Sequence, residues 1–197
     1  MLRAIASDIR CLGRRDGLIE TVRKVGGGLR GHDVVVIAKR LDEIADIAFE
    51  ERMELADLGV ADLPALAELN ARRCDRRATG RFTAALARGD HGFIARLDGE
   101  VAGYYWWVDR HHPHLELLGI RLAERDVYGY DFLVAEEYRG DGRAIELLHG
   151  IETRLRDRGY RRLWGYVRTD NRPARWLYSM RGYEAARTVR VMPGGIR

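Results

Sequence analysis

Residues 134–155, "VAEEYRGDGRAIELLHGIETRL", place Gly140 and Gly142 between an apolar run and a segment with helical periodicity. The preceding run, "VYGYDFLV" (127–134), is typical of a strand. The apolar stripe of the following helix consists of Leu148, Ile151 and Leu155. A strand, a glycine turn and a helix N-terminus together gather unpaired backbone N–H groups at the positive end of a helix dipole. We therefore predict an anion-binding turn here.

Two other interpretations of this turn compete with a ligand site. A dinucleotide-binding fingerprint requires a third glycine where Ile145 stands, so that motif is not met. A plain turn without a ligand remains open on these residues alone. Glycine at 140 and 142 leaves no Cβ atom between the backbone and a bulky diphosphate, which favours the phosphate interpretation.

The composition is that of an ordinary globular protein. Of 197 residues, 46% are hydrophobic and 32% are charged, and the formal net charge is +4. An excess so small and evenly spread does not predict nucleic-acid binding. Cys11 and Cys74 lack zinc-site spacing, so we predict no metal and a reducing compartment. The longest strictly apolar run, "VVVIA", is too short to cross a bilayer, and we expect a cytoplasmic protein.

Residues 1–49 are predicted to form an N-terminal extension. Apolar residues recur at helical spacing over residues 1–25, glycines at 26–28 form a connector, and "DVVVIAKRL" (33–41) is typical of a strand. Arginines on the polar side of the amphipathic helix would allow a weak contact with an anionic membrane or an acyl carrier. Packing against its own domain explains the same pattern.

Residues 50–197 alternate strand and helix patterns. A helix is expected to start at Asp62, with Pro64 in its first turn, and a second to end at Gly89. A hairpin follows, turning at Asp98–Gly99, and then a polar loop leads to the strand at 127–134. Later elements are a helix over 144–158, a strand over 161–167, a helix from Pro173 and a strand over 183–192. This order predicts an α/β (α+β) fold: a single mixed central sheet with helices on both faces.

Two motifs give the chain a family resemblance. Residues 139–144, "RGDGRA", fit the pattern Gln/Arg-x-x-Gly-x-Gly/Ala, and "NRPARWLYSMRGYE" (171–184) fits "N..A..LY...GF". In this order and spacing, the motifs resemble those of the GNAT superfamily of acyl-CoA-dependent N-acyltransferases. The resemblance covers residues 50–197, which we predict to form one GNAT-like domain.

The resemblance implies a binding site for acetyl-CoA or another acyl-CoA as co-substrate. The backbone amides that would bind its pyrophosphate are those of Gly140, Asp141, Gly142, Arg143 and Ala144. The side chains of Arg139 and Arg143 could add contacts. The pantetheine arm would run beside Val134, in a gap between the strands at 127–134 and 161–167, with Asn171 near its far end.

Amine attack on a thioester requires a neutral nucleophile, a polarised carbonyl and a proton for the departing thiolate. By resemblance Tyr178 is the acid that protonates the thiolate, although it could be only an aromatic on the apolar side of its helix. A backbone N–H near Val134 would polarise the carbonyl. Asp131 is the predicted base, because an acid inside an apolar strand must be paired or functional. Strand alternation, however, puts Tyr128 and Tyr130 on one side of the sheet and Asp131 on the other.

Three further features have open interpretations. The histidines of "DRHHPHLE" (109–116) could shuttle protons, but such a segment is more often a polar loop. The aromatic residues at 104–107 alternate between two faces, so one pair could line the acceptor pocket or all four could form core. Glu136 and Glu137 lie beside the expected phosphate site, and we predict that they face solvent.

The predicted function is transfer of an acetyl or other acyl group from acyl-CoA to a primary amine of a small molecule or peptide. One alternative is a long-chain acyltransferase that uses acyl-CoA or acyl carrier protein to acylate an amino acid or envelope amino-sugar. Another is a CoA-binding module without catalysis. The sequence names neither the acceptor nor the oligomeric state, and a homodimer is compatible with it.

Overall fold

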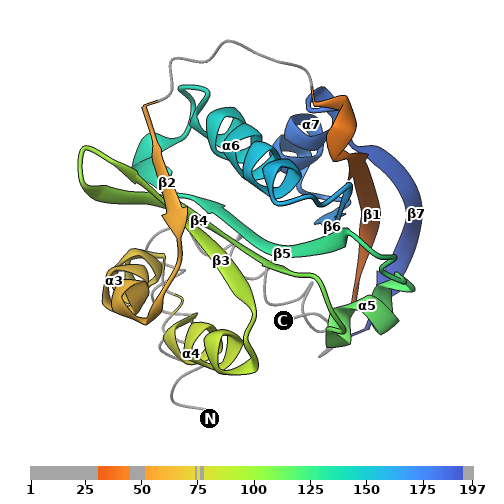
Figure 1. The fold of residues 1–197 in the computed structure, drawn as a ribbon, viewed down its shortest axis with the longest axis horizontal. Coiled ribbons are helices and arrows are strands. Elements are labelled where there is room, and N and C mark those ends of the chain that lie inside the picture. Colours follow the sequence, from red (N-terminus) through yellow and green to blue (C-terminus); the bar gives the residue numbers. More distant parts are fainter. Residues whose placement is uncertain (1–30, 45–51, 74, 76–77, 193–197) are drawn as a thin grey trace.

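The computed structural model describes residues 31–44, 52–73, 75 and 78–192 (Figure 1). The helix predicted over residues 1–25, its glycine connector and the boundary predicted between residues 49 and 50 lie outside the described residues. Both cysteines lie outside them too. No helix within the described ranges is long and apolar enough to cross a membrane.

The described strands form one mixed sheet in the order β2-β3-β4-β5-β6-β1-β7. Their bounds are β1 (His32–Arg40), β2 (Glu54–Asp57), β3 (His91–Leu97), β4 (Glu100–Val108), β5 (Asp126–Val134), β6 (Arg162–Arg168) and β7 (Glu184–Val191). Neighbouring strands are antiparallel except for β5 and β6, which are parallel. The predicted single mixed sheet is confirmed.

Helices cover both faces of this sheet, as predicted (Figure 1). One face carries α6 (Arg143–Asp157) and α7 (Arg172–Met180), and the other carries α3 (Leu63–Arg72), α4 (Ala78–Arg88) and α5 (Pro113–Leu118). Short 3-10 turns are η1 (Leu41–Glu43), η2 (Val60–Asp62) and η3 (Glu136–Tyr138). Leu148, Ile151 and Leu155 of α6 are fully buried on the first face, which confirms the predicted stripe.

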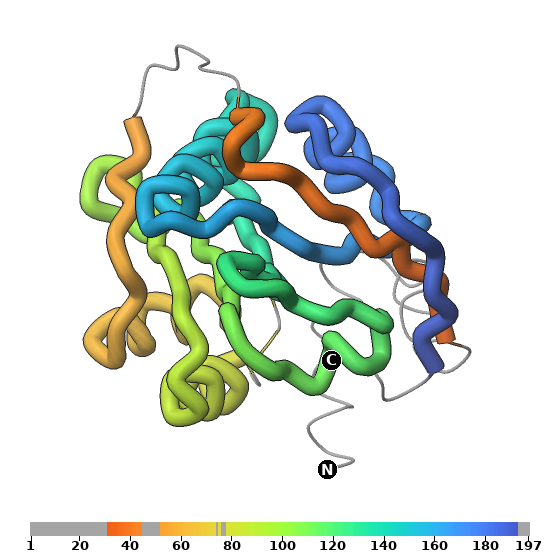
Figure 2. Tube along the Cα trace, turned by 45° about the vertical axis from the view of Figure 1, so that its right-hand side comes forward, coloured from red at the N-terminus to blue at the C-terminus, as the bar shows by residue number. Residues whose placement is uncertain are grey.

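The strand predicted over 33–41 is β1, and it lies inside the sheet. It pairs with β6 on one side and β7 on the other, so the start and end of the described chain lie side by side (Figure 2). Lys39 Nζ of β1 is 2.8 Å from Glu152 Oε2 of α6, and both side chains are buried. The chain before residue 50 thus supplies an interior strand to the central sheet. Its continuous apolar run suits a strand that is covered on both faces.

The segment expected to be a polar loop between β4 and β5 contains the short helix α5. Pro113 occupies its first turn, the His112 side chain accepts a hydrogen bond from the His114 N–H (3.2 Å), and Gly119 ends it at φ +63°. These are ordinary start and stop signals. A helix of six residues is too short to show a periodic pattern, which is why the sequence did not reveal it.

The aromatic residues at 104–107 form core on both faces. Tyr104 and Trp106 pack against Phe82 with ring centroids 5.1 and 5.3 Å away, while Tyr105 and Trp107 belong to the cluster under α6. All four are buried. Of the two interpretations, the structure supports core packing.

Candidate active site

The glycine turn between β5 and α6 has the backbone that the motif predicts. Gly140 has φ +103° and Gly142, the residue before the first turn of α6, has φ +77°. Both values lie in the left-handed region that favours glycine. A Cβ atom at either position would meet no atom within 4 Å, so the turn faces open space. Glycine at these positions permits the left-handed backbone and leaves open space above the turn.

The backbone N–H groups of residues 140–144 point to an anion site. Within the described structure none of them donates a hydrogen bond, and no side chain caps α6. The first bonded amides are those of Ile145 and Glu146, which both donate to the Gly142 carbonyl. A run of open N–H groups at the positive end of a 15-residue helix is suited to a phosphate group.

The two arginines of the turn are engaged with the protein itself. Arg143 Nη1 donates to Glu146 Oε2 at 2.6 Å, and its side chain is largely buried. Arg139 Nε donates to the Val134 carbonyl at 3.1 Å and its side chain remains half exposed. Contacts of either guanidinium with a phosphate remain a prediction, and Arg139 is the more exposed of the two.

The two glutamates before the turn face solvent, which confirms the prediction. Glu136 and Glu137 are exposed, and Glu137 Oε1 lies 3.2 Å from Arg72 Nη1 of α3. Glu136 Oε1 lies 3.7 Å from Arg139 Nη1, so each glutamate has an arginine beside it.

Strands β5 and β6 separate beside this turn. They pair only from Asp126 to Tyr128, opposite Arg162 to Trp164. Beyond Tyr128 neither strand hydrogen-bonds to the other, so a gap opens toward Val134, as predicted. The sheet therefore has no hydrogen bonds between β5 and β6 over the rest of β5, between the face that carries α6 and α7 and the face that carries α4 and α5.

A β-bulge in β5 decides where Asp131 points. Trp106 of β4 pairs with Asp131 but Trp107 pairs with Gly129, so Tyr130 is an extra residue without a partner. The bulge shifts the alternation by one, and Tyr130 and Asp131 both line one pocket. The prediction that they lie on opposite sides was wrong, because alternation holds only in a regular strand.

The backbone at Gly129 is closely approached from the opposite face. A Cβ atom there would lie 1.6 Å from the Tyr105 hydroxyl oxygen, so only glycine fits. The tyrosine ring thus occupies the space that a side chain at the bulge would take.

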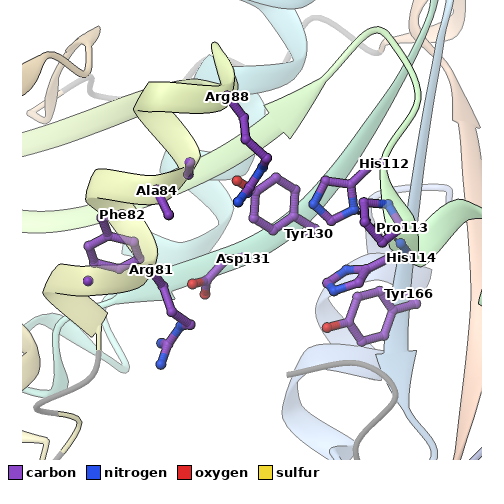
Figure 3. A pocket seen from close by; sticks show the side chains of 12 residues that line it. Arg81, Phe82, Ala84, Arg88, His112, Pro113, His114, Tyr130, Asp131 and Tyr166 are labelled. Carbon is purple, nitrogen blue, oxygen red and sulfur yellow. Dashed lines mark hydrogen bonds between the residues drawn. The ribbon is translucent and has the colours of Figure 1, made fainter.

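The pocket beside Asp131 has a volume of about 690 Å³ (Figure 3). Helix α4 contributes one wall, the start of α5 another, and β5 and β6 the floor. The lining side chains with chemistry or aromatic faces are Arg81, Phe82, Arg88, His112, His114, Tyr130, Asp131 and Tyr166. It lies on the face of the sheet opposite α6 and α7, at the gap between β5 and β6.

Burial raises the pKa of Asp131 to about 6, and the nearby guanidiniums of Arg81 and Arg73 limit the rise. The carboxyl group is therefore mostly ionised above pH 7 and can still accept a proton near neutrality. A pKa close to the working pH is what general-base catalysis requires.

Tyr130 is held at the bulge by two contacts. Its hydroxyl donates to the buried carboxylate of Asp90 at 3.0 Å, and its ring stacks on His112 with centroids 4.8 Å apart. Arg88 Nη2 donates to the same Asp90 oxygen at 2.6 Å. These contacts fix the extra residue and, with it, the direction of Asp131.

Two of the three histidines face the pocket in the neutral form. Burial lowers the pKa of His112, and burial together with His112 and Arg88 lowers the pKa of His114 to about 4. His114 Nδ1 lies 3.2 Å from the Tyr128 hydroxyl. His111 is exposed and sits 3.8 Å from Glu116. Of the three histidines, only His111 has the exposed position expected of a residue in a polar loop; His112 and His114 line the pocket.

Tyr178 lies on the other side of the gap, on α7. Its ring packs against Tyr183 (4.9 Å) and Phe132 (6.5 Å). Burial raises the pKa of Tyr178, and the groups Tyr166, Glu152 and Asp131 raise it further. The hydroxyl therefore carries its proton at every working pH, as a proton donor must. Tyr166, which no sequence pattern singled out, lines the pocket with Asp131, and burial together with Asp131 raises its pKa.

Asn171 caps α7. Its Oδ1 accepts a hydrogen bond from the Ala174 N–H at 3.2 Å, and the residue is exposed. This contact starts the helix that carries Tyr178. The predicted contact of Asn171 with the pantetheine arm remains a prediction. No group of three or more potential metal ligands occurs in the described part of the chain.

Comparison with curated proteins finds an uncharacterized N-acetyltransferase, YycN, from Bacillus subtilis (strain 168). It is 31% identical over 94 residues, which are 39% of this chain and 60% of that protein. The chain thus spans less than two thirds of this relative's length.

Solved structures share the fold at low identity. A glucosamine N-acetyltransferase region of a fungal multi-domain β-N-acetylglucosaminidase superposes with a TM-score of 0.63 at 18% identity, covering 87% of this chain and 22% of that one. The ribosomal-protein-S18-alanine N-acetyltransferase of Escherichia coli superposes with a TM-score of 0.53 at 17% identity, covering 71% of this chain and 94% of that one. A GCN5-related N-acetyltransferase from Sphaerobacter thermophilus superposes with a TM-score of 0.55 at 16% identity, covering 87% of this chain and 55% of that one.

The family model for the acetyltransferase (GNAT) family matches residues 60–183. The matched span runs from η2, just before α3, to three residues past the end of α7, and it includes the glycine turn, the bulge and the gap between β5 and β6. Because it covers more than half of the chain, the resemblance seen in the two motifs is confirmed, and the protein belongs to the GNAT acetyltransferase family.

Proposed function

We propose that the protein transfers an acetyl group from acetyl-CoA to a primary amine. The observation that carries the proposal is the position of two sites on opposite faces of one gap. Open amides at residues 140–144 lie on one side, and the pocket with Asp131 lies on the other. A thioester bound on the first face would meet an amine held on the second.

The turn provides the donor site. The backbone N–H groups of residues 140–144 would bind the pyrophosphate, and the positive end of α6 would favour its charge. The pantetheine arm would lie along Val134, where β5 has lost its partner. Asn171 would hold the start of α7 at the far end of that arm, and a backbone N–H near Val134 would polarise the carbonyl.

The groups at the gap match the proton transfers that the reaction needs. The amine nitrogen forms a bond to the thioester carbonyl carbon and loses a proton, which Asp131 accepts directly or through water. The C–S bond breaks, and Tyr178 donates its proton to the departing thiolate. The proton on Asp131 leaves to solvent and Tyr178 regains one, so one amide and one free thiol form for each thioester consumed.

A thiol-release assay with acetyl-CoA and a panel of primary amines tests this proposal. We expect amine-dependent release, and calorimetry should show acetyl-CoA binding with residues 139–144 protected from hydrogen exchange. Binding without release above background would instead favour the non-catalytic module. Turnover that rises with acyl chain length would favour the long-chain alternative.

A further inference from the structure

The pocket beside Asp131 carries two arginines on one wall. Arg81 and Arg88 lie seven residues apart on α4, so two helical turns, about 10 Å, separate them along the axis. Both line the pocket, and their side chains are 41% and 50% exposed, so each retains N–H groups that a ligand can reach (Figure 3).

The charges near Arg81 are balanced, because the guanidiniums of Arg81 and Arg73 lie near two carboxylates, those of Asp75 and Asp131. Arg81 donates to both carboxylate oxygens of Asp75, at 3.1 and 2.7 Å. Asp131 lies close enough to Arg81 for each charge to affect the other's pKa. Among the lining residues, all within the described structure, Asp131 is the sole carboxylate. The carboxylate that an amine would contact at this end of the pocket is therefore that of Asp131.

The charges near Arg88 are not balanced. The buried Asp90 carboxylate lies 2.6 Å from Arg88 and 3.6 Å from Arg110, so one negative charge serves two positive ones. It also accepts the Tyr130 hydroxyl. His112 and His114, which face this end, are neutral because burial lowers the pKa of both. Arg88 lines the pocket and Arg110 lies beside it, so this region carries an excess of about one positive charge that Arg88 presents to the pocket.

An uneven charge distribution of this kind selects among amines. A polyamine would find one carboxylate and would meet the positive excess with its second ammonium group, which is unfavourable. An anionic group near Arg88 would instead accept charge-assisted hydrogen bonds from its remaining N–H groups. An amine without an anionic group would leave the excess positive charge at Arg88 without a partner.

We propose that the acceptor is an amino carboxylic acid, which places its amine beside Asp131 and its carboxylate at Arg88. This inference rests on the proposed acetyl transfer and adds the substrate class. The flat walls formed by Tyr130, His112 and Tyr166 would contact the carbon skeleton between the two groups.

Matched acceptors test the role of the carboxylate. The pairs are 4-aminobutyrate with butylamine, 5-aminovalerate with pentylamine, and 6-aminohexanoate with hexylamine; spermidine represents the polyamines and glucosamine the amines without an acid group. Hydrogen bonds to charged groups contribute about 1.5–3 kcal/mol, so at least one amino acid should exceed its matched amine by about 10- to 100-fold in kcat/KM. Faster turnover of spermidine, glucosamine or all the matched amines would overturn the proposal.

Variants of Arg88 locate the effect. In Arg88→Gln, kcat/KM for each amino acid should come close to kcat/KM for its matched amine. Arg88→Lys should retain part of the preference for the amino acid, because the positive charge is kept. Arg96→Gln is the matched control, because Arg96 also pairs with an aspartate (Asp62, 2.8 Å) but lies outside the pocket. Melting temperatures of all three variants reveal any that fail to fold. A ratio unchanged in a folded Arg88→Gln variant would refute the assignment.

Failure of the proposed reaction would look different. If no amine releases thiol, acetyl transfer fails, and calorimetry with the same acceptors still decides the inference. Tighter binding of the acids than of their amines, lost in Arg88→Gln, would support the carboxylate site. Equal binding would reject it.

Discussion

The glycine turn at 139–144 and the pocket beside Asp131 meet at the same gap but are built in different ways. The turn uses backbone N–H groups of consecutive residues, and it remains open to solvent. The pocket uses side chains from α4, α5, β5 and β6, and several of them are buried and held by one another. A ligand common to a whole family can be bound by backbone, whereas a ligand particular to one protein requires side chains. The following variants separate the two regions.

The largest effect is expected from Asp131→Asn. Loss of a general base typically costs 10²- to 10⁴-fold, so kcat should fall by at least ~10²-fold while acetyl-CoA affinity stays unchanged. In the unchanged protein, kcat should fall as the pH drops below about 6, where Asp131 takes up a proton. Steady-state rates between pH 5 and 9 measure both. A variant with full activity and the same acid limb would exclude Asp131 as the base.

The same variant should be more stable at high pH. Burial raises the pKa of Asp131 above that of the unfolded chain, so the carboxyl stabilises the fold only while protonated. That contribution is complete below pH 4 and is lost as the pH rises through 6. Since one pKa unit is worth about 1.4 kcal/mol, Asp131→Asn should gain up to ~3 kcal/mol at pH 8 and little at pH 3.5. Urea unfolding at the two pH values measures the difference.

Tyr178→Phe should reduce kcat by ~10²-fold or more if the hydroxyl protonates the thiolate. The ring contacts with Phe132 and Tyr183 remain, so calorimetry should give the acetyl-CoA affinity of the unchanged protein. Donors with a more acidic thiol need less help from an acid and should recover part of the rate. An unchanged kcat would remove Tyr178 from the mechanism.

Gly142→Ala should weaken acetyl-CoA binding by ~10-fold, because a left-handed conformation costs a side-chain residue roughly 1–2 kcal/mol and the turn would relax. Gly159→Ala is the matched control. Gly159 has φ +88° at the other end of α6, and a Cβ atom there also meets nothing within 4 Å. Both variants should lose similar stability, but only Gly142→Ala should lose affinity. Equal affinities in calorimetry would argue against the turn as the donor site.

The smallest effect is expected from Tyr130→Phe. Loss of the hydrogen bond to Asp90 should loosen the bulge, lower kcat a few-fold and move the acid limb to lower pH as Asp131 becomes better hydrated. Tyr160→Phe is the control, since it loses a comparable bond to Asp109 outside the pocket (2.7 Å). If both variants keep the pH profile of the unchanged protein, Tyr130 does not position the base.

The sequence by itself determined the glycine turn, the helix behind it, the sheet class and the family. These rest on local signals: positive-φ glycines, a stripe of three buried residues on α6, and two motifs in fixed order. It also fixed the hairpin at Asp98 and Gly99, which both have positive φ. Backbone conformation over a few residues depends on neighbours in the chain, so a pattern can carry it.

Only the tertiary structure decided the pocket. The bulge at Tyr130 turns Asp131 toward α4, and no pattern of alternation reveals a residue that the partner strand skips. The neutral state of His114 and the sharing of Asp90 between Arg88 and Arg110 depend on burial and on contacts between distant segments. The place of β1 inside the sheet likewise comes from pairing across more than 100 residues. The charge state of a side chain and the direction in which it points depend on how it packs, and packing brings together residues that lie far apart in the sequence.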